Sequence, residues 1–183
     1  MAKIGPTGRE AYFGDDEIIV SKTDLKGIIT YPNDVFARVA GYTEAELLGK
    51  PHSIIRHPDM PACVYQLLWD TLKARQEIFA YVLNMAKDGS HYWVFAHVTP
   101  SYDLAGNHTG YHSSHRVPYP DALPAVKVLY ARLCEEERKF ANKNQAIEAS
   151  THVLLDLLAK QGQSYSEFVF GLSKFTSLGE AAA

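Results

Sequence analysis

Histidine is the residue type in this sequence whose placement most suggests chemistry. Three of the eight histidines, His108, His112 and His115, follow one another in a segment whose alternating pattern predicts a β-strand. On a strand, His108 and His112 share one face, and His115 lies on the other. Because no cysteine or paired carboxylate accompanies them to complete a coordination shell, the sequence predicts no metal site.

A second group of chemically capable residues lies in the stretch Ile55-Arg56-His57-Pro58-Asp59-Met60-Pro61. A guanidinium, an imidazole and a carboxylate this close together can form a salt-bridged turn that closes a loop around the two prolines. The two cysteines, Cys63 and Cys134, lack metal-ligand spacing and fit a reducing cytoplasm. No nucleophile elbow, phosphate-binding loop or metalloprotease helix occurs, so we expect a protein that is not an enzyme.

Composition narrows the class of protein and its partners. The 183 residues are 46% hydrophobic and 21% charged, which is typical of a globular protein with one main core. The net charge is -3 and the 18 basic residues are scattered, which predicts no binding to nucleic acid. No stretch approaches the roughly 18 apolar residues of a membrane span, and the N-terminus lacks the apolar core of a signal peptide. We therefore expect no membrane insertion and a cytoplasmic location.

Periodicity and turn signals predict the elements that position these residues. Residues 1–14 are glycine-rich with little periodicity and predict a flexible arm. Strands are expected at 17–23, 28–31, 78–85, 91–100 and 108–117, with short helices between the second and the third. Thr43 and Glu46 have the spacing of a helix capping box, and an apolar stripe predicts a longer helix from Pro61 to Arg75.

The last third of the sequence favours helix. A nearly unbroken helix is predicted over 122–160, because one apolar residue recurs every seven positions; these are Val126, Leu133, Phe140, Ile147 and Leu154. A coiled coil needs a second apolar position in each seven-residue repeat, and here that position is apolar only at the two ends of the segment. This pattern favours weak or switchable pairing with a second chain, or folding back on the same chain. A further helix is expected after Ser164, with an apolar stripe of Phe168, Leu172, Phe175 and Leu178.

Several local motifs resemble the PAS family of sensory domains. They are the segments from Asn33 to Phe36 and from Gly41 to Lys50, and the turn Lys87-Asp88-Gly89-Ser90 followed by His91-Tyr92-Trp93-Val94. The stretch around Arg56 and the segment from Trp69 to Lys73 are similar to the PAS domains of bacterial aerotaxis receptors, which carry FAD. The resemblance implies an α+β fold: a five-stranded antiparallel sheet with short helices on one face, spanning 15–118, followed by C-terminal helices at 119–183.

The resemblance also implies a set of cofactor-binding residues. Arg56 would pair with the phosphates of FAD, His57 and Asp59 would orient the same loop, and Trp69 would offer a stacking plane. Asn33 and Asn84 would bind polar edges of the ring, and Tyr65 would line the mouth of the cavity. From the residues alone, Trp69 also fits ordinary core packing, and Asn84 fits a cross-strand pair.

The sequence as a whole predicts a bacterial signalling protein that senses redox state or a small ligand. Its helices would relay the change to a second copy of the chain, a histidine kinase or a chemotaxis component. Ile78 stands where aerotaxis receptors often have tryptophan, and two alternatives to FAD remain. One is a cofactor-free PAS interaction module, and the other is a haem-binding gas sensor that uses His57 or His91.

Overall fold

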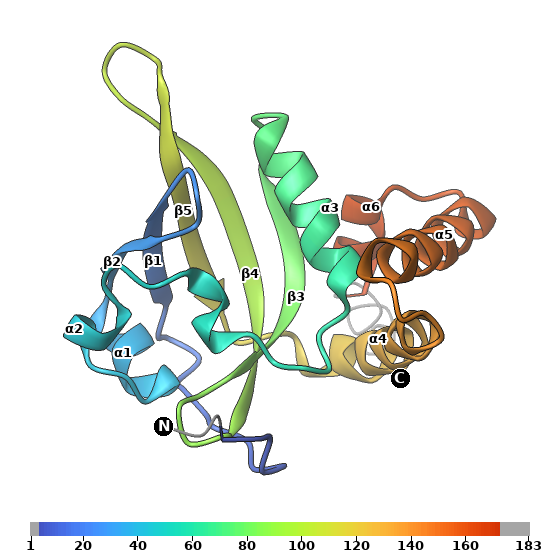
Figure 1. The fold of residues 1–183 in the computed structure, drawn as a ribbon, viewed down its shortest axis with the longest axis horizontal. Helices are drawn as coiled ribbons and strands as arrows, with labels where there is room; N and C mark the ends of the chain where they lie inside the picture. Colours follow the sequence, from blue (N-terminus) through green and yellow to red (C-terminus); the bar gives the residue numbers. More distant parts are fainter. Residues whose placement is uncertain (1–3, 173–183) are drawn as a thin grey trace, which may run out of the picture. The chain divides into compact units, whose positions relative to one another are not determined.

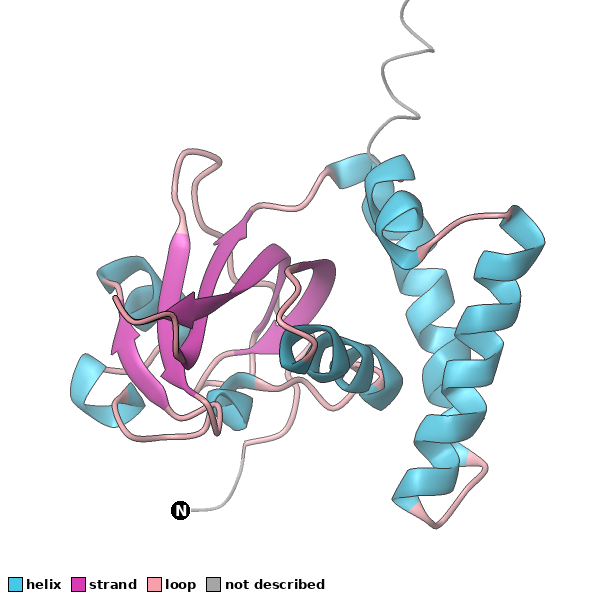
Figure 2. Ribbon diagram, turned by 90° about the horizontal axis from the view of Figure 1, so that it is seen from above, coloured by secondary structure: helices cyan, strands magenta, loops and turns pink. Residues whose placement is uncertain are grey.

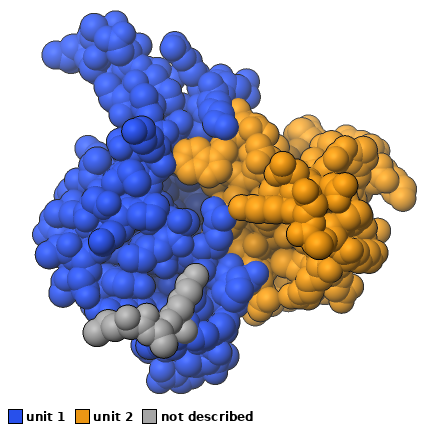
Figure 3. All heavy atoms as spheres, viewed as in Figure 1, with its two compact units in different colours: residues 1–58, 71–117 blue, residues 59–70, 118–183 orange. Residues whose placement is uncertain are grey.

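Residues 4–172 are described by the computed structural model, and they divide into two units, which Figure 3 colours separately. Among these residues, 4–58 and 71–117 form the first unit, and 59–70 and 118–172 form the second. The sequence predicts one domain over 15–118, whereas the structure groups residues 59–70 of that range with the C-terminal helices.

The first unit is built on one antiparallel sheet (Figure 1). Its strands are β1 (Ile19–Asp24), β2 (Ile29–Pro32), β3 (Ile78–Met85), β4 (His91–Tyr102) and β5 (His108–Arg116). They lie in the order β2-β1-β5-β4-β3, so the N-terminal hairpin adds to the last strand of the chain. The predicted five-stranded antiparallel sheet and the α+β class are confirmed.

Alternation along the strands gives the sheet one face that is largely buried. In one row across four strands, Ala80 of β3 pairs with Ala96 of β4, which pairs with His115 of β5, which pairs with Ile19 of β1. All four side chains are at most 5% exposed. Cross-strand partners lie on the same face of a sheet, so these residues form a continuous part of the core.

Short helices and turns follow β2 and cover part of the buried sheet face (Figure 1). Helix α1 (Asp34–Ala40) ends at Gly41, whose φ of 70° is the left-handed conformation that glycine adopts without strain. Helix α2 (Glu44–Leu47) begins with the predicted capping box of Thr43 and Glu46, which is confirmed. The 3-10 helix η1 (His52–Ile55) then leads into Arg56.

The N-terminal arm pairs with the β3–β4 turn, although its composition predicts a flexible segment. Thr7 N donates to Gly89 O over 2.9 Å, and His91 exchanges backbone hydrogen bonds of 2.8 Å with Arg9 and Ala11. Asp88 forms an exposed ion pair with Arg9 at 3.0 Å. The arm pairs with the turn through a few backbone hydrogen bonds and is not a strand of the sheet. Its apolar and polar residues therefore need not alternate.

The second unit is helical. It contains residues 62–70 of α3 (Ala62–Lys73), the 3-10 helix η2 (Pro120–Ala122), α4 (Leu123–Arg138), α5 (Lys143–Gln161) and α6 (Tyr165–Gly171). Helices α4 and α5 pack side by side as a hairpin (Figure 2). The predicted capping box at Ser164 and Glu167 begins α6. Phe175 and Leu178 of the predicted stripe lie outside the described residues.

The prediction of one unbroken helix over 122–160 is wrong, because the chain turns between α4 and α5. Asn142 caps α5, since its side chain accepts hydrogen bonds from the amides of Asn144 and Gln145. The turn leaves Phe140 38% exposed, whereas Leu133 and Leu154 of the predicted seam are buried in the hairpin. The seven-residue repeat therefore contributes to an intramolecular helix pair. Among residues 4–172, no helix combines the length and the apolar character needed to cross a membrane.

Candidate functional site

The structure brings Arg56 and Asn84 together. Their backbones form an isolated antiparallel bridge between the end of η1 and β3. Asn84 is 2% exposed and faces the core, and its Nδ2 has no hydrogen-bond partner among the described residues. An unpaired buried amide costs about 1–3 kcal/mol. The Nδ2 of Asn84 is therefore an unsatisfied hydrogen-bond donor on the inner face of the sheet.

His57 and Asn33 occupy different surroundings in the first unit. His57 is 5% exposed, and its ring meets that of His91 edge to face, with 6.1 Å between centroids. Asn33 is engaged by backbone: Oδ1 accepts from the amides of Phe36 and Val20, each over 3.0 Å, and Nδ2 donates to the carbonyl of Ile18 over 2.8 Å. These bonds give Asn33 a structural role that joins β1 to α1.

The remaining predicted residues, Asp59, Tyr65 and Trp69, belong to the second unit. Asp59 forms an exposed ion pair with Arg138 of α4, at 3.1 Å. Its carbonyl accepts a hydrogen bond from Cys134 Sγ over 3.3 Å. Tyr65 and Trp69 lie on α3 and are half-buried. In this unit, Asp59 joins the loop before α3 to α4.

Sequence reasoning missed a polar cluster inside the first unit. Ser21 of β1 and Ser113 of β5 lie opposite each other and are 2% and 8% exposed. Ser113 Oγ lies 2.5 Å from His115 Nε2, and Ser21 Oγ lies 3.0 Å from Nε2 of His52. The rings of His52 and His115 meet edge to face, with 6.3 Å between centroids. The available signal was two serines at inward-facing strand positions, where apolar residues are expected.

Burial keeps both histidines of this cluster neutral. Desolvation is the main cause that lowers the pKa of His52 to about 4, and the nearby positive charge of Arg56 lowers it further. Desolvation likewise lowers the pKa of His115 to about 3, with a smaller effect from His52. At neutral pH the cluster can donate and accept hydrogen bonds without carrying charge.

A second missed residue, Glu137 of α4, caps the N-terminus of α3. Its Oε2 accepts from the amide of Ala62 and its Oε1 from the amide of Cys63, each over 3.1 Å. The buried hydroxyl of Ser150, on α5, donates to the same Oε1 over 2.9 Å. A carboxylate at this position satisfies amides that lack partners within the helix, and it also interacts favourably with the helix dipole. Glu137 thus connects α3, α4 and α5.

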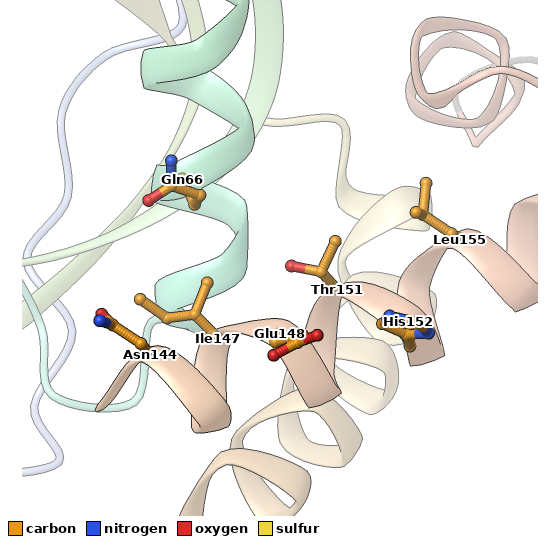
Figure 4. A pocket seen from close by; sticks show the side chains of 7 residues that line it. All are labelled: Gln66, Asn144, Ile147, Glu148, Thr151, His152 and Leu155. Atoms are coloured by element: carbon orange, nitrogen blue, oxygen red, sulfur yellow. The ribbon is translucent and has the colours of Figure 1, made fainter. Parts of the chain in front are cut away.

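Two pockets in the second unit are lined by residues other than the predicted ones. One, of about 350 Å³, is bordered by Gln66 of α3 and by residues of α5 (Figure 4); its lining consists of Gln66, Asn144, Ile147, Glu148, Thr151, His152 and Leu155. The other, of about 470 Å³, shares Gln66, Thr151 and Leu155 with it. Neither includes a predicted cofactor residue. Within residues 4–172, no three His, Cys, Asp or Glu side chains are grouped to hold a metal ion.

Comparison with known proteins gives one family and several relatives. Residues 29–115 match the family model described as PAS fold. The chain is 39% identical over 127 residues to the aerotaxis receptor of Escherichia coli, covering 69% of this chain and 25% of the receptor. It is 36% identical over 83 residues to the nitrogen fixation regulatory protein of Klebsiella pneumoniae, covering 45% of this chain and 17% of that protein. The chain thus spans a quarter or less of these two relatives.

A solved structure confirms the fold. A light-oxygen-voltage domain, from a study of a flavin analogue, superposes with a TM-score of 0.53 and 22% identity, covering 67% of this chain and 87% of that one.

Proposed function

Because residues 29–115 belong to the PAS-fold family, we propose that this chain is a redox sensor whose PAS domain binds FAD and whose C-terminal helices relay the change. The resemblance to aerotaxis receptors, which implies FAD, rests on motifs that continue through the Arg56 stretch. The 39% identity to one such receptor supports it.

The buried amide of Asn84 is the observation that carries this proposal. Its Nδ2 lies in the core without a partner among residues 4–172, so a carbonyl or ring nitrogen of a bound ligand would satisfy it. Arg56, paired with Asn84 through the backbone, brings a half-buried positive charge to the same place. A guanidinium there suits the phosphates of FAD. The residues present fit a polar, anionic, ring-containing ligand.

In this proposal the ring system of FAD supplies reversible uptake of electrons and protons, and the protein supplies orientation. Arg56 would hold the phosphates, Asn84 would hold a polar ring edge, and the apolar residues of the inner sheet face would exclude water. A redox change of the ring would alter the hydrogen bonds that Asn84 can make. The contacts between the ligand and β3 would then differ between the two redox states, and this difference would be relayed to the C-terminal helices.

Glu137 provides the connection on the output side. Segment 59–63 follows Arg56 and His57 directly in the chain, and its contacts to Cys134, Glu137 and Arg138 attach it to the helix hairpin. We propose that a shift of the Arg56 loop is transmitted through these contacts to α4 and α5. The partner would be a signalling protein such as a histidine kinase or a chemotaxis component, in a bacterial cytoplasm. Pairing of two copies through the repeat would require the hairpin to open, since Leu133 and Leu154 are buried in it.

The absorption spectrum of freshly purified protein tests the ligand. A yellow preparation that releases FAD on heating, identified by mass, is expected, with Arg56→Ala and Asn84→Leu each retaining less FAD per folded chain. A colourless preparation that binds no added FAD would support a cofactor-free interaction module, and a red one would support haem. Full retention of FAD by both variants would show that Arg56 and Asn84 do not bind the cofactor.

A further inference from the structure

A groove runs between α3 and α5 in the second unit, and the proposed function gives it no role. It consists of the two pockets of about 350 Å³ and about 470 Å³, which adjoin each other because both are lined by Gln66, Thr151 and Leu155. In Figure 4, Gln66 comes from α3, and Thr151 and Leu155 come from α5. Along α5 this α3–α5 groove extends from Asn144 to Ala159, which is about 22 Å or about four helical turns.

The lining of the α3–α5 groove is largely apolar, and part of it is open to solvent. Leu155 is 55% exposed, although it belongs to both pockets. Ile147 of α5 and Leu67 of α3 also line the groove and are half-buried, whereas Leu154 and Leu158 of α5 are buried. An uncovered apolar stripe along a helix is the kind of surface that the apolar face of a second helix covers.

Carboxylates border the α3–α5 groove at both of its pockets. Glu148 of α5 lines the smaller pocket and Asp70 of α3 lines the larger one, and both side chains are exposed. Asp70 is oriented by Gln66, whose Nε2 donates to Oδ1 over 2.9 Å and to Oδ2 over 3.0 Å. Among the described residues that line the two pockets there is no Lys or Arg. A partner with positive charge beside its apolar face therefore complements the groove.

The contact that joins α3 to the helix hairpin lies at the same groove. Cys63 lines the larger pocket, and its amide donates to Glu137 Oε1. The same oxygen accepts a hydrogen bond from Ser150 of α5. Glu137 thus fixes the first turn of α3 to α5, and these two helices are the walls of the groove. A partner that contacts both walls is sensitive to their relative position.

We propose that the α3–α5 groove binds an amphipathic helix of about 15 residues from a partner protein, with large apolar side chains on one face and Lys or Arg at the margins of that face. The apolar face covers Leu155 and its half-buried neighbours, and the basic side chains lie next to Glu148 and Asp70. This inference goes beyond the proposed function, because binding of such a helix does not require FAD.

Binding of two synthetic peptides of about 15 residues to the full chain tests this proposal. One peptide has leucine at the spacing of one helix face and lysine elsewhere, and the other has glutamate in place of each lysine. Fluorescence anisotropy at physiological salt should show that the lysine peptide binds about tenfold more tightly or better. Its affinity should fall about tenfold in Leu155→Ala, which removes an apolar contact, and in Glu148→Lys, which reverses a charge. Both residues are exposed, so neither change removes packing from the core.

The matched control is Glu135→Lys, because Glu135 is exposed on α4 and lines neither pocket. This variant should bind the lysine peptide as the unaltered chain does. Equal affinity of the lysine peptide for all three variants would overturn the proposal. Binding that occurs only after residues 173–183 are deleted would also overturn it, because that segment would then be the occupant. A dimer that dissociates in Leu155→Ala, measured by analytical ultracentrifugation, would overturn it in favour of a second copy of the chain.

Discussion

Three side chains, the half-buried Asn33 and the buried Asn84 and His115, differ in whether the protein satisfies their polar atoms. The amide of Asn33 is used by three backbone groups of β1 and α1, which is what a structural residue requires. The amide of Asn84 and the Nδ1 of His115 are buried, and residues 4–172 offer them no partner. Since unmet hydrogen bonds in a core cost free energy, the last two positions are the ones where a ligand would stabilise the fold.

Replacement of Asn33 should affect stability more than ligand binding. Asn33→Ala removes the helix cap and two further hydrogen bonds, so we expect the free energy of unfolding to fall by about 2 kcal/mol. Asn33→Asp keeps both acceptor bonds and should lose clearly less. Urea unfolding of the two variants measures this, and FAD bound per folded chain should stay unchanged. A variant Asn33→Ala as stable as the unaltered chain would contradict the structural role.

Acid should destabilise the first unit through His52 and His115. Both have a folded-state pKa below the unfolded value, about 4 and about 3 against about 6.5. The unfolded chain therefore binds more protons as pH falls below about 6.5, and stability declines from there towards the folded-state pKa values. Each histidine contributes a loss of at most about 2 kcal/mol by pH 5. Urea unfolding between pH 7.5 and 5 should show this decline, and His115→Gln should reduce it; an equal decline in the variant would exclude His115 as a source.

At the scale of elements, the connections depend on groups at helix ends and turns. The break between α4 and α5 rests on Asn142, and the attachment of α3 to the hairpin rests on Glu137. The N-terminal arm is held at the β3–β4 turn by Gly89, whose φ is 82°. Each of these contacts involves few atoms, and a single substitution can remove it.

Removal of the Glu137 carboxylate should loosen the start of α3. In Glu137→Ala the amides of Ala62 and Cys63 lose their acceptor and Ser150 keeps only the carbonyl of Ile147, so we expect about 1–2 kcal/mol less stability. Hydrogen exchange should become faster at residues 62–65 and along α5. Glu135→Ala, an exposed change on the same helix, is the control and should match the unaltered chain. Equal exchange at residues 62–65 in both variants would show that the cap does not hold α3.

A methyl group at Gly89 should displace the N-terminal arm. The added Cβ would lie 2.4 Å from the carbonyl oxygen of Gly5, and the positive φ adds strain of about 1 kcal/mol. Gly106→Ala carries a similar strain, with φ of 80°, but meets nothing within 4 Å among the described residues. Trypsin should therefore cleave after Arg9 faster in Gly89→Ala than in Gly106→Ala. Equal cleavage rates would indicate that the arm does not depend on this contact.

At the scale of the whole molecule, local sequence patterns predicted the helices and strands. They did not predict contacts between residues far apart in the sequence. The strands and the capping box of Thr43 followed from alternation and from residue types at fixed spacing. The repeat through Val126, Leu133 and Leu154 correctly marked buried residues, but a heptad pattern does not distinguish a helix hairpin from a long helix. Glu137 caps α3 from 74 residues away along the chain, and no local pattern signals such a contact.

The candidate site was predictable only in part, for the same reason. The resemblance to aerotaxis receptors pointed to Arg56 and Asn84, which the fold joins in one backbone bridge. The resemblance could not separate Asn33, whose amide is engaged by backbone groups, from Asn84, whose Nδ2 is not. It also gives no role to His115, because strand alternation places His108 and His112 on one face and His115 on the other, which suggests no shared site.

Hydrogen exchange of the FAD-loaded chain, oxidised and then reduced with dithionite, is the most direct test of a sensor that relays through Glu137. We predict that reduction changes exchange at residues 59–63 and along α5 in the unaltered chain. In Glu137→Ala the change should persist next to Arg56 but disappear from α5. Identical exchange of α5 in the two redox states of the unaltered chain would contradict the account.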